Sequence, residues 1–421
     1  MLKRVLIKAL LAILVSFYIF PISFSFFPEG LNTKMLLAVL GIIFFLYDCL
    51  KRGAFSISRP VLVSSILAIV FSIWCLFSIA ENATSDTTYS RYWLSFATWL
   101  GGAYGVCFLI RELTGGLDLE RLSYYLALVC LVQCIMAVWM DNSLTLRTFV
   151  DLYIVQDQSF LHTINRLYGI GASLDPAGVR FSVVLVLIAH QLSNNGFAVQ
   201  SAVKTIFYFV SFAIITVIGS IIARTTWVGA AVGIVYMVFS NLKTKKGMME
   251  VRQIAFWLTL FGVVLVTVGI STYLYDHNEA FRANLRFGFE GFFNWVETGV
   301  FRTDSTDKLN RIMWVWPKDT RSWILGTGLF DNWVYGTDIG YCRFTLYCGL
   351  VGLVLFSIFF IYNGIAFSMK LDNVTLLSIS LIALTFIIWL KVSTDIFFIY
   401  ALLFCLDDQQ RTDVQCTSST T

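Results

Sequence analysis

The stretch "TIFYFVSFAIITVIGSIIARTTWVGAAVGIVYMVFS", residues 205–240, decides the fold. It holds two apolar runs, at about 205–222 and 226–240, and the connection between them contains Arg224, the only charged residue of the stretch. A helix needs about 20 mostly apolar residues to cross the hydrocarbon core of a bilayer. The stretch therefore predicts two membrane spans that hold a permanent positive charge between them.

The rest of the chain has the same apolar character. Of its 421 residues, 58% are hydrophobic and 13% are charged, whereas soluble domains are about half apolar and a quarter charged. A transmembrane β-barrel would instead show alternating segments of about 10 residues. The predicted fold class is therefore an all-α polytopic membrane protein. The net charge of +4 follows from the topology of the loops, so no nucleic-acid partner is predicted.

Apolar runs of suitable length predict about 12 transmembrane helices in a single domain, 1–406. They lie at about 5–27, 35–50, 60–80, 93–110, 122–140, 176–192, 205–222, 226–240, 254–274, 341–365, 374–390 and 394–406. Alternate short loops, 51–59, 111–121 and 241–252, are basic, and Lys and Arg are retained on the cytoplasmic side. Both termini are therefore predicted to be cytoplasmic, and the polar tail 407–421 is expected to be disordered.

Two longer loops are predicted on the opposite, periplasmic side, at about 141–175 and 275–340, the second just before the tenth span. Their basic residues call for an anionic ligand or a membrane surface. Within the second loop, 278–299 has apolar residues at three- and four-residue steps, as an amphipathic helix does. This helix either lies in the membrane interface or packs as a lid on the helix bundle, and the sequence leaves both alternatives open.

Several ionisable residues are predicted to gather near the periplasmic face. They are Arg166, Asp175, Arg180, Arg224, Asp338 and Arg343. Arginine suits phosphate because its planar fork stays charged and donates paired hydrogen bonds, so this set suggests a phosphate-bearing lipid head group. An arginine at a span end is more often a snorkelling anchor, and for Arg180 and Arg343 both interpretations remain open. The small residues around Arg224 favour a functional role there.

No motif of a soluble enzyme and no metal-binding spacing occurs in the sequence, so no metal and no cofactor is predicted. Three segments instead resemble the Wzy-type polymerases of O-antigen and capsular polysaccharide, which are related to the O-antigen ligases. These segments are "NRLYGIGASLDPAGVRFS" (165–182), "IIARTTWVGAAVG" (221–233) and "GTDIGYCRFTLYCGLVGLVLF" (336–356). Their order and spacing, and the late long loop, extend the resemblance over essentially the whole chain.

The third segment distinguishes the two branches of this superfamily. Ligases carry a histidine at the place that Asp338 holds here, whereas polymerases often carry an Asp-x-Gly-Tyr pattern, which "DIGY" with Tyr341 matches. The resemblance therefore favours a polymerase over a ligase that transfers glycan to a lipid A core. A transporter or flippase of a lipid-linked oligosaccharide is a further alternative, because the same arginines could bind such a substrate without reacting.

The resemblance implies an enzyme at the periplasmic face of the bacterial inner membrane. It would join repeat units carried on undecaprenyl pyrophosphate, which serve as donor and acceptor, and a chain-length regulator protein is a common partner in the family. Arg224 would clamp the pyrophosphate leaving group, and Asp338 is the candidate base, although His162 or the substrate itself could also take the proton. The candidate substrate-binding residues are Arg166, Arg180, Arg286, Tyr341 and Arg343.

Overall fold

The computed structural model describes residues 2–156, 158–163, 166–194, 202–242, 251–331 and 334–407. In these ranges almost all regular structure is helical, and the strands β1 (Ser23–Phe24) and β2 (Ile154–Val155) form one short antiparallel pair. The predicted all-α fold class is therefore confirmed.

Eight of the described helices are long and apolar enough to cross a membrane. They are α2 (Thr33–Arg52), α3 (Arg59–Glu81), α4 (Tyr92–Thr114), α5 (Leu119–Asn142), α8 (Leu174–Asn194), α10 (Ala202–Ile222), α12 (Val251–His277) and α17 (Gly340–Ser368). Shorter apolar helices are α1 (Leu2–Ile19), α11 (Thr226–Leu242), α18 (Thr375–Ile388) and α19 (Phe397–Phe404). The chain is a multi-pass helical membrane protein, and the count of twelve spans stays a prediction.

The chain divides into two compact units. Unit 1 comprises Met1–Leu14, Lys34–Leu122 and Ile312–Thr421, and unit 2 comprises Val15–Thr33 and Ser123–Arg311. The single domain over 1–406 therefore stays a prediction. The predicted tail lies outside the described residues, except for Asp407.

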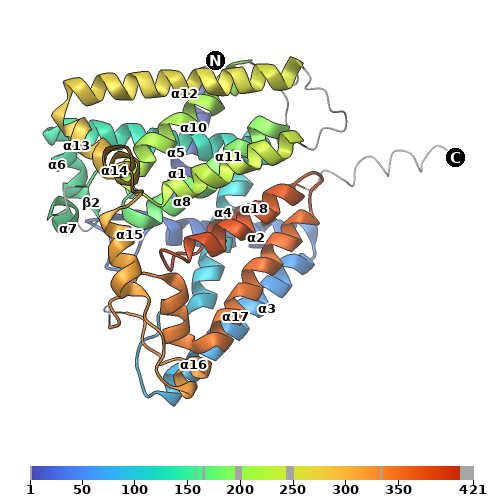
Figure 1. Ribbon diagram of the computed structural model, residues 1–421. Helices are drawn as coiled ribbons and strands as arrows, with labels where there is room; N and C mark the ends of the chain where they lie inside the picture. Colours follow the sequence, from blue (N-terminus) through green and yellow to red (C-terminus); the bar gives the residue numbers. More distant parts are fainter. Residues whose placement is uncertain are drawn as a thin grey trace. The chain divides into compact units, whose positions relative to one another are not determined.

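Unit 1 is built around α17. This helix is kinked at Gly349 and runs along α3, and it also packs on α16 (Thr320–Leu325), α18 and α19 (Figure 1). Aromatic rings fill the space between these helices, and Phe356 is stacked on Phe71 of α3 and on Trp389 after α18. Packing of large apolar rings thus joins segments that are far apart in the sequence.

Unit 2 is built around α8, the most buried of the candidate spans. The helices α10 and α11 pack on it. At Gly229 of α11 the backbones come so close that a Cβ atom there would lie 2.1 Å from Ser182 Cα. The Ser182 hydroxyl also donates a hydrogen bond to the Thr225 carbonyl, at 2.9 Å. These contacts fix the short connection between α10 and α11 against α8.

The segment predicted as one amphipathic helix forms two helices, α13 (Glu279–Gly288) and α14 (Glu290–Thr298), which meet at Phe289. Leu285 and Gly288 of α13 are buried, and Gly288 packs against Ile221 of α10. The apolar side of α14 is exposed, at Phe292, Trp295 and Val296. The helix α13 therefore packs on the bundle, whereas α14 presents an exposed apolar face, as an interfacial helix does.

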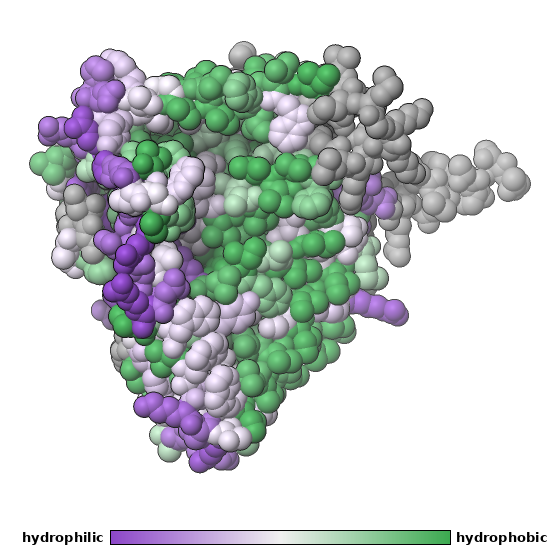
Figure 2. All heavy atoms as spheres, viewed as in Figure 1, coloured by the Kyte–Doolittle hydropathy of each residue, from purple (hydrophilic) through white to green (hydrophobic). Residues whose placement is uncertain are grey.

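The remaining short elements of the described chain are α6 (Leu144–Tyr153), α7 (Gln158–Thr163), α15 (Asp304–Lys308) and the π-helix η1 (Leu309–Met313). In unit 2, apolar side chains cover the visible face of α12, and polar side chains gather over α15 (Figure 2). The polar segments that follow α12 therefore lie at one end of an apolar helix.

Candidate functional site: a basic cleft in unit 2

The connection between α10 and α11 consists of three residues, Ala223, Arg224 and Thr225. Its backbone accepts hydrogen bonds from the helix that follows, among them one from the Thr226 amide to the Ala223 carbonyl and one from the Trp227 amide to the Arg224 carbonyl. The Thr225 hydroxyl donates to the Asp175 carboxylate in the first turn of α8. The backbone of Arg224 is thus fixed on both sides.

The guanidinium of Arg224 contacts three different side chains. Its Nη2 lies 2.6 Å from Glu290 Oε2, and its Nη1 donates to Ser305 Oγ at 2.9 Å. The guanidinium also lies over the ring of Phe287, at 4.1 Å from the ring centre. The side chains of Arg224 and Glu290 are only 17% and 19% exposed. The charge of Arg224 is therefore balanced by a partly buried carboxylate.

The Glu290 carboxylate is itself held on its other side. The Asp304 backbone amide donates to Glu290 Oε1 at 2.7 Å. In contrast, the Nε atom of Arg224 is buried and has no hydrogen-bond partner within the described ranges. A buried donor without a partner has a free-energy cost of about 1–3 kcal/mol. Arg224 thus retains capacity for a further acceptor.

Arg166 approaches the same aromatic ring. Its guanidinium lies 4.9 Å from the centre of Phe287. Burial lowers the pKa of Arg166, and the neighbouring Arg224 lowers it further, whereas the Asp175 carboxylate opposes both effects. Two guanidinium groups that repel each other are therefore held close to one aromatic side chain. A bound anion would reduce the repulsion between them.

Arg286 is the third arginine of the group and comes from α13. It donates to the Tyr275 hydroxyl at 3.0 Å and to Glu297 Oε1 at 2.7 Å, and it lies over the Phe293 ring at 5.0 Å. The hydrogen bond with Tyr275, and then that with Glu297, raises the pKa of Arg286. Its side chain is 43% exposed, so it stays accessible from solvent.

These residues line a cleft of about 500 Å³. Figure 1 labels the helices α13, α14 and α15, which contribute most of the lining residues. Its lining consists of Arg166, Arg224, Arg286, Phe287, Glu290, Phe293, Asn294, Asp304 and Ser305. Three of the arginines singled out from the sequence thus meet in one cleft. A cleft with three fixed guanidinium groups and aromatic walls can bind an anion with several oxygens, such as a phosphate or pyrophosphate.

Arg180 lies elsewhere in unit 2. It belongs to α8, and its guanidinium is 5.8 Å from the centre of the Phe20 ring. Arg180 is not among the described residues that line the cleft. Its role as a substrate-binding residue therefore stays a prediction. The side chain of His162 lies outside the described part of the chain.

The other predicted site residues belong to unit 1. Arg343 donates to the Phe330 carbonyl at 2.8 Å and lies over the Phe330 ring, and the Asp338 carboxylate interacts with it electrostatically. The Tyr341 hydroxyl donates to the Phe386 carbonyl at 3.0 Å. Asp338, Tyr341 and Arg343 thus lie at or just before the start of α17, where Asp338 interacts with Arg343 and Tyr341 contacts α18. The arginines of the cleft and this group thus belong to different units.

Sequence reasoning missed six residues of the cleft: Phe287, Glu290, Phe293, Asn294, Asp304 and Ser305. Phe287 was a detectable signal, because it lies in the amphipathic segment near Arg286. Glu290 and Ser305 gave no local signal, because both gain their importance from contacts with Arg224, which is distant in the sequence.

The helices and the cleft define a multi-pass, all-α membrane protein with a basic cleft outside its apolar segments. In comparisons with known proteins, no family model matches the chain, and no similar curated protein and no similar solved structure is found.

Proposed function

We propose that the protein is a membrane glycosyltransferase that polymerises undecaprenyl-pyrophosphate-linked oligosaccharide repeat units into O-antigen or capsular polysaccharide. The observation that carries the proposal is the meeting of Arg166, Arg224 and Arg286 in one cleft. The resemblance of three segments to the Wzy-type polymerases supplies the reaction. The setting is the periplasmic face of a bacterial inner membrane, with both termini cytoplasmic.

In the proposed reaction, a hydroxyl oxygen of one lipid-linked repeat unit attacks the anomeric carbon of another. The bond between that carbon and the pyrophosphate oxygen breaks, and its electron pair leaves with the pyrophosphate. Negative charge builds up on the leaving group in the transition state, so arginines fixed around it lower the barrier. Arg224 is the proposed clamp because its backbone is held on both sides and its Nε has no hydrogen-bond partner among the residues that the structure describes.

The proton of the attacking hydroxyl needs an acceptor. Asp338 remains the proposed base, because a carboxylate can take this proton directly. Its neighbours Tyr341 and Arg343 remain proposed substrate contacts, together with Arg180. Nothing in the proposed reaction requires a metal or another cofactor, since arginines can balance the charge of the pyrophosphate.

Glu290 has a defined part in the proposed cycle. Its carboxylate lies 2.6 Å from the guanidinium of Arg224 and balances its charge. A pyrophosphate carries more charge than a carboxylate and presents more oxygens, so it can displace Glu290 from Arg224. We therefore assign Glu290 as an internal counter-ion, which keeps the guanidinium in place between turnovers.

The exposed face of α14 supports a lipid-linked substrate. Phe292, Trp295 and Val296 are exposed on the helix that also contributes Phe293 to the cleft. Aromatic and apolar side chains of this kind lie favourably at the membrane interface. A polyprenyl pyrophosphate has its charged group at the same level, and the cleft would receive it there.

The test uses purified protein in liposomes with lipid-linked repeat units extracted from the host, and it resolves the products by size. We expect a ladder of repeats from the unaltered protein and its loss in Arg224→Ala. Arg302→Ala, which removes an arginine of unit 2 that pairs with Asp307, is the matched control and should keep the ladder. A retained ladder in Asp338→Ala would remove that residue as the base.

Other products would identify the alternatives. A single transfer to an added lipid A core would indicate a ligase, and movement of the lipid-linked unit across the bilayer without reaction would indicate a flippase. If a chain-length regulator protein acts on this polymerase, adding it should narrow the range of product lengths. A ladder that survives Arg224→Ala would contradict the proposed clamp.

A further inference from the structure

A second cavity lies within unit 1. Its volume is about 740 Å³, and α2, α3 and α4 form most of its wall, with the end of the described chain after α19 closing one side. Apolar residues line one part of it, including Ile42, Phe45, Val61, Phe96 and Leu100. The residues of the cleft described above belong to unit 2, so this cavity is a separate site.

The packing of α2 on α4 explains why the cavity exists. At Gly41 the two backbones touch, because a Cβ atom there would lie 1.8 Å from the Gly101 carbonyl oxygen. Beyond this contact Phe45, Asp48 and Arg52 line the cavity from one face of α2. From Gly41 to Arg52 this face extends for about 16 Å along the helix axis. The cavity is therefore a groove that runs lengthwise between helices.

The groove changes from apolar to polar along its length. Near the ends of α2 and α4 its lining includes Asp48, Arg52, Tyr104, Arg111 and Lys370. The Tyr104 hydroxyl donates to Asp48 Oδ2 at 2.5 Å. Arg52 lies 3.6 Å from the same carboxylate, and its side chain is 68% exposed. Three cations thus line the groove and face two carboxylates, Asp48 in the lining and Asp407 beside Arg111, so its polar end keeps a positive balance.

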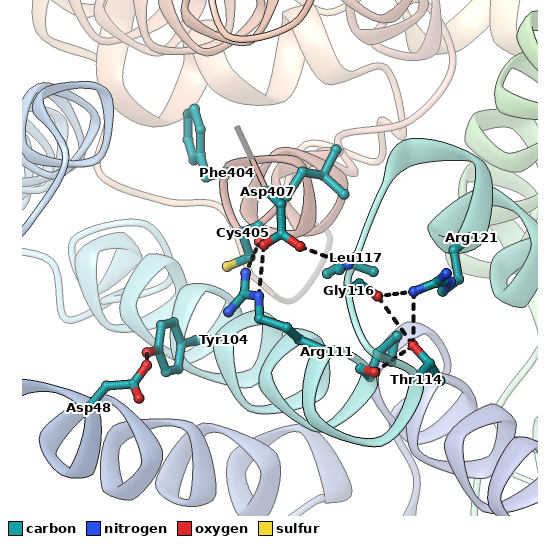
Figure 3. Close-up of polar contacts among 12 residues, drawn as sticks. Asp48, Tyr104, Arg111, Thr114, Gly116, Leu117, Arg121, Phe404, Cys405 and Asp407 are labelled. Carbon is teal, nitrogen blue, oxygen red and sulfur yellow. Dashed lines mark hydrogen bonds and ion pairs between the residues drawn. The ribbon is translucent and has the colours of Figure 1, made fainter. Parts of the chain in front are cut away.

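Two of these cations, Arg111 and Lys370, are held by the end of the described chain. Figure 3 shows the contact of Arg111 with Asp407. Arg111 Nε donates to Asp407 Oδ1 at 2.7 Å, and the other oxygen of Asp407 accepts from the Leu117 amide at 2.8 Å. Lys370 Nζ donates to the carbonyls of Phe404 and Leu406, at 2.7 and 2.6 Å. These bonds fix Arg111 and Lys370 at the groove, whereas Arg52, which is exposed and pairs with Asp48, can change its position to contact a ligand.

We propose that this groove binds one anionic glycerophospholipid. An acyl chain would lie along the apolar wall formed by Ile42, Phe45 and Leu100, and the phosphate would lie against Arg52 and Arg111. A groove of this kind in a membrane protein favours an acyl chain over water, because its apolar wall offers water few hydrogen bonds. Basic residues at the end of membrane helices attract anionic head groups.

The groove lies at the membrane face where α2 and α4 end, and the basic loops 51–59 and 111–121 follow these two helices. The positive-inside rule assigns this face to the cytoplasm. The lipid would therefore come from the inner leaflet, opposite to the face proposed for polysaccharide synthesis. The proposed lipid site does not depend on the proposed enzymatic activity.

The experiment measures lipids retained by the full-length protein. The protein is placed in nanodiscs with equal amounts of phosphatidylglycerol and phosphatidylcholine, extracted in mild detergent, and analysed by native mass spectrometry. We expect one phosphatidylglycerol to be retained per chain, and at least fivefold less in Arg52→Ala. Arg59→Ala is the matched control. Arg59 is the first residue of α3, its side chain is exposed, and it does not line the groove.

A second variant tests the apolar part of the groove. Leu100→Trp fills the space of the acyl chain and should reduce retention of phosphatidylglycerol by a similar factor while Arg52 is intact. Thermal unfolding of each variant shows whether the fold is preserved. Equal retention of both lipids, retention of a free fatty acid instead, or equal retention in Arg52→Ala and the unaltered protein would each overturn the proposal.

Discussion

Arg224 and Glu290 form an ion pair of 2.6 Å in which both side chains are less than one-fifth exposed. Removing one partner of such a pair leaves the other charge uncompensated, which is more damaging than losing an exposed pair. The pair joins the connection between α10 and α11 to the first turn of α14. Glu290 therefore occupies one side of the Arg224 guanidinium, where an added anion would compete with it.

We expect Glu290→Gln to bind inorganic pyrophosphate more tightly than the unaltered protein. The amide keeps an oxygen for the Asp304 N–H but no longer neutralises Arg224. A tenfold lower Kd is the expected size, which corresponds to about 1.4 kcal/mol. Isothermal titration calorimetry in detergent measures it, with Glu279→Gln as a control at an exposed position of α13.

The same titration separates two hypotheses. No binding to the unaltered protein, or binding that Arg224→Ala leaves unchanged, would contradict the anion site itself. Binding that depends on Arg224 but is not tightened by Glu290→Gln would contradict only the role of Glu290 as a displaceable counter-ion.

Phe287→Leu should weaken pyrophosphate binding although it keeps an apolar side chain. The ring of Phe287 lies under the guanidinium groups of both Arg166 and Arg224. Each such contact contributes about 0.5–1 kcal/mol, so the two together contribute about 1–2 kcal/mol, and we expect a roughly five- to thirtyfold higher Kd. Phe287→Tyr, which keeps the ring, should bind nearly as the unaltered protein does. Equal binding by the Leu and Tyr variants would show that the ring is not needed.

Gly229→Ala should lower the thermal stability of the protein. Its new methyl group would lie 2.1 Å from Ser182 Cα, so α11 must move away from α8. Overpacking of this kind costs about 1–3 kcal/mol. Gly262→Ala in α12 is the control, because a Cβ atom there meets no other atom within 4 Å. Differential scanning fluorimetry should show a lower Tm for Gly229→Ala alone, and equal Tm values would refute the predicted close packing.

Asp86 should make the protein sensitive to acid. Burial favours the neutral form of its carboxyl, but hydrogen bonds from Thr88 and from the amides of Asp331 and Phe330 outweigh this and lower the pKa of Asp86. The group therefore stabilises the fold above its ordinary pKa of 3.8, and this contribution is lost as the pH falls through the lower folded-state pKa.

Asp86→Asn tests this dependence. The unaltered protein should lose more thermal stability than the variant between about pH 5 and pH 3. Glu29→Gln, at an exposed carboxylate, controls for the loss of a negative charge. Parallel stability curves for the unaltered protein and Asp86→Asn would show that Asp86 has no such role.

The helical fold and the position of Arg224 were predictable because both depend on local sequence. The first predicted apolar run ends at Ile222, where α10 ends, and the second begins at Thr226, where α11 begins. The break of the amphipathic segment at Phe289 was not predictable, because its apolar spacing continues through this residue. The backbone of Phe289 leaves the helical conformation where α14 begins.

The composition of the cleft was predictable only in part. Charge in an apolar context singled out Arg224, and basic loop residues indicated Arg166 and Arg286 as candidates. Motif order alone gave no distances, so the same reasoning could not separate these arginines from Arg180, or from Asp338 and Arg343 of the other unit. Partners such as Glu290 depend on tertiary contacts that no local pattern records.

The helix α12 couples unit 2 to the lipid bilayer around it. Its candidate span has 24 residues, Ile254–His277, and only 6% of its most apolar window is buried in the protein. Such a span is about 36 Å long, whereas the hydrocarbon core is about 30 Å thick, so α12 must tilt or thicken the lipid around it. Since α13 begins two residues after α12 ends, hydrophobic mismatch would set the depth at which Arg286 and Phe287 meet the bilayer surface. A change in membrane thickness would then affect the cleft, just as a substitution of one of its lining residues would.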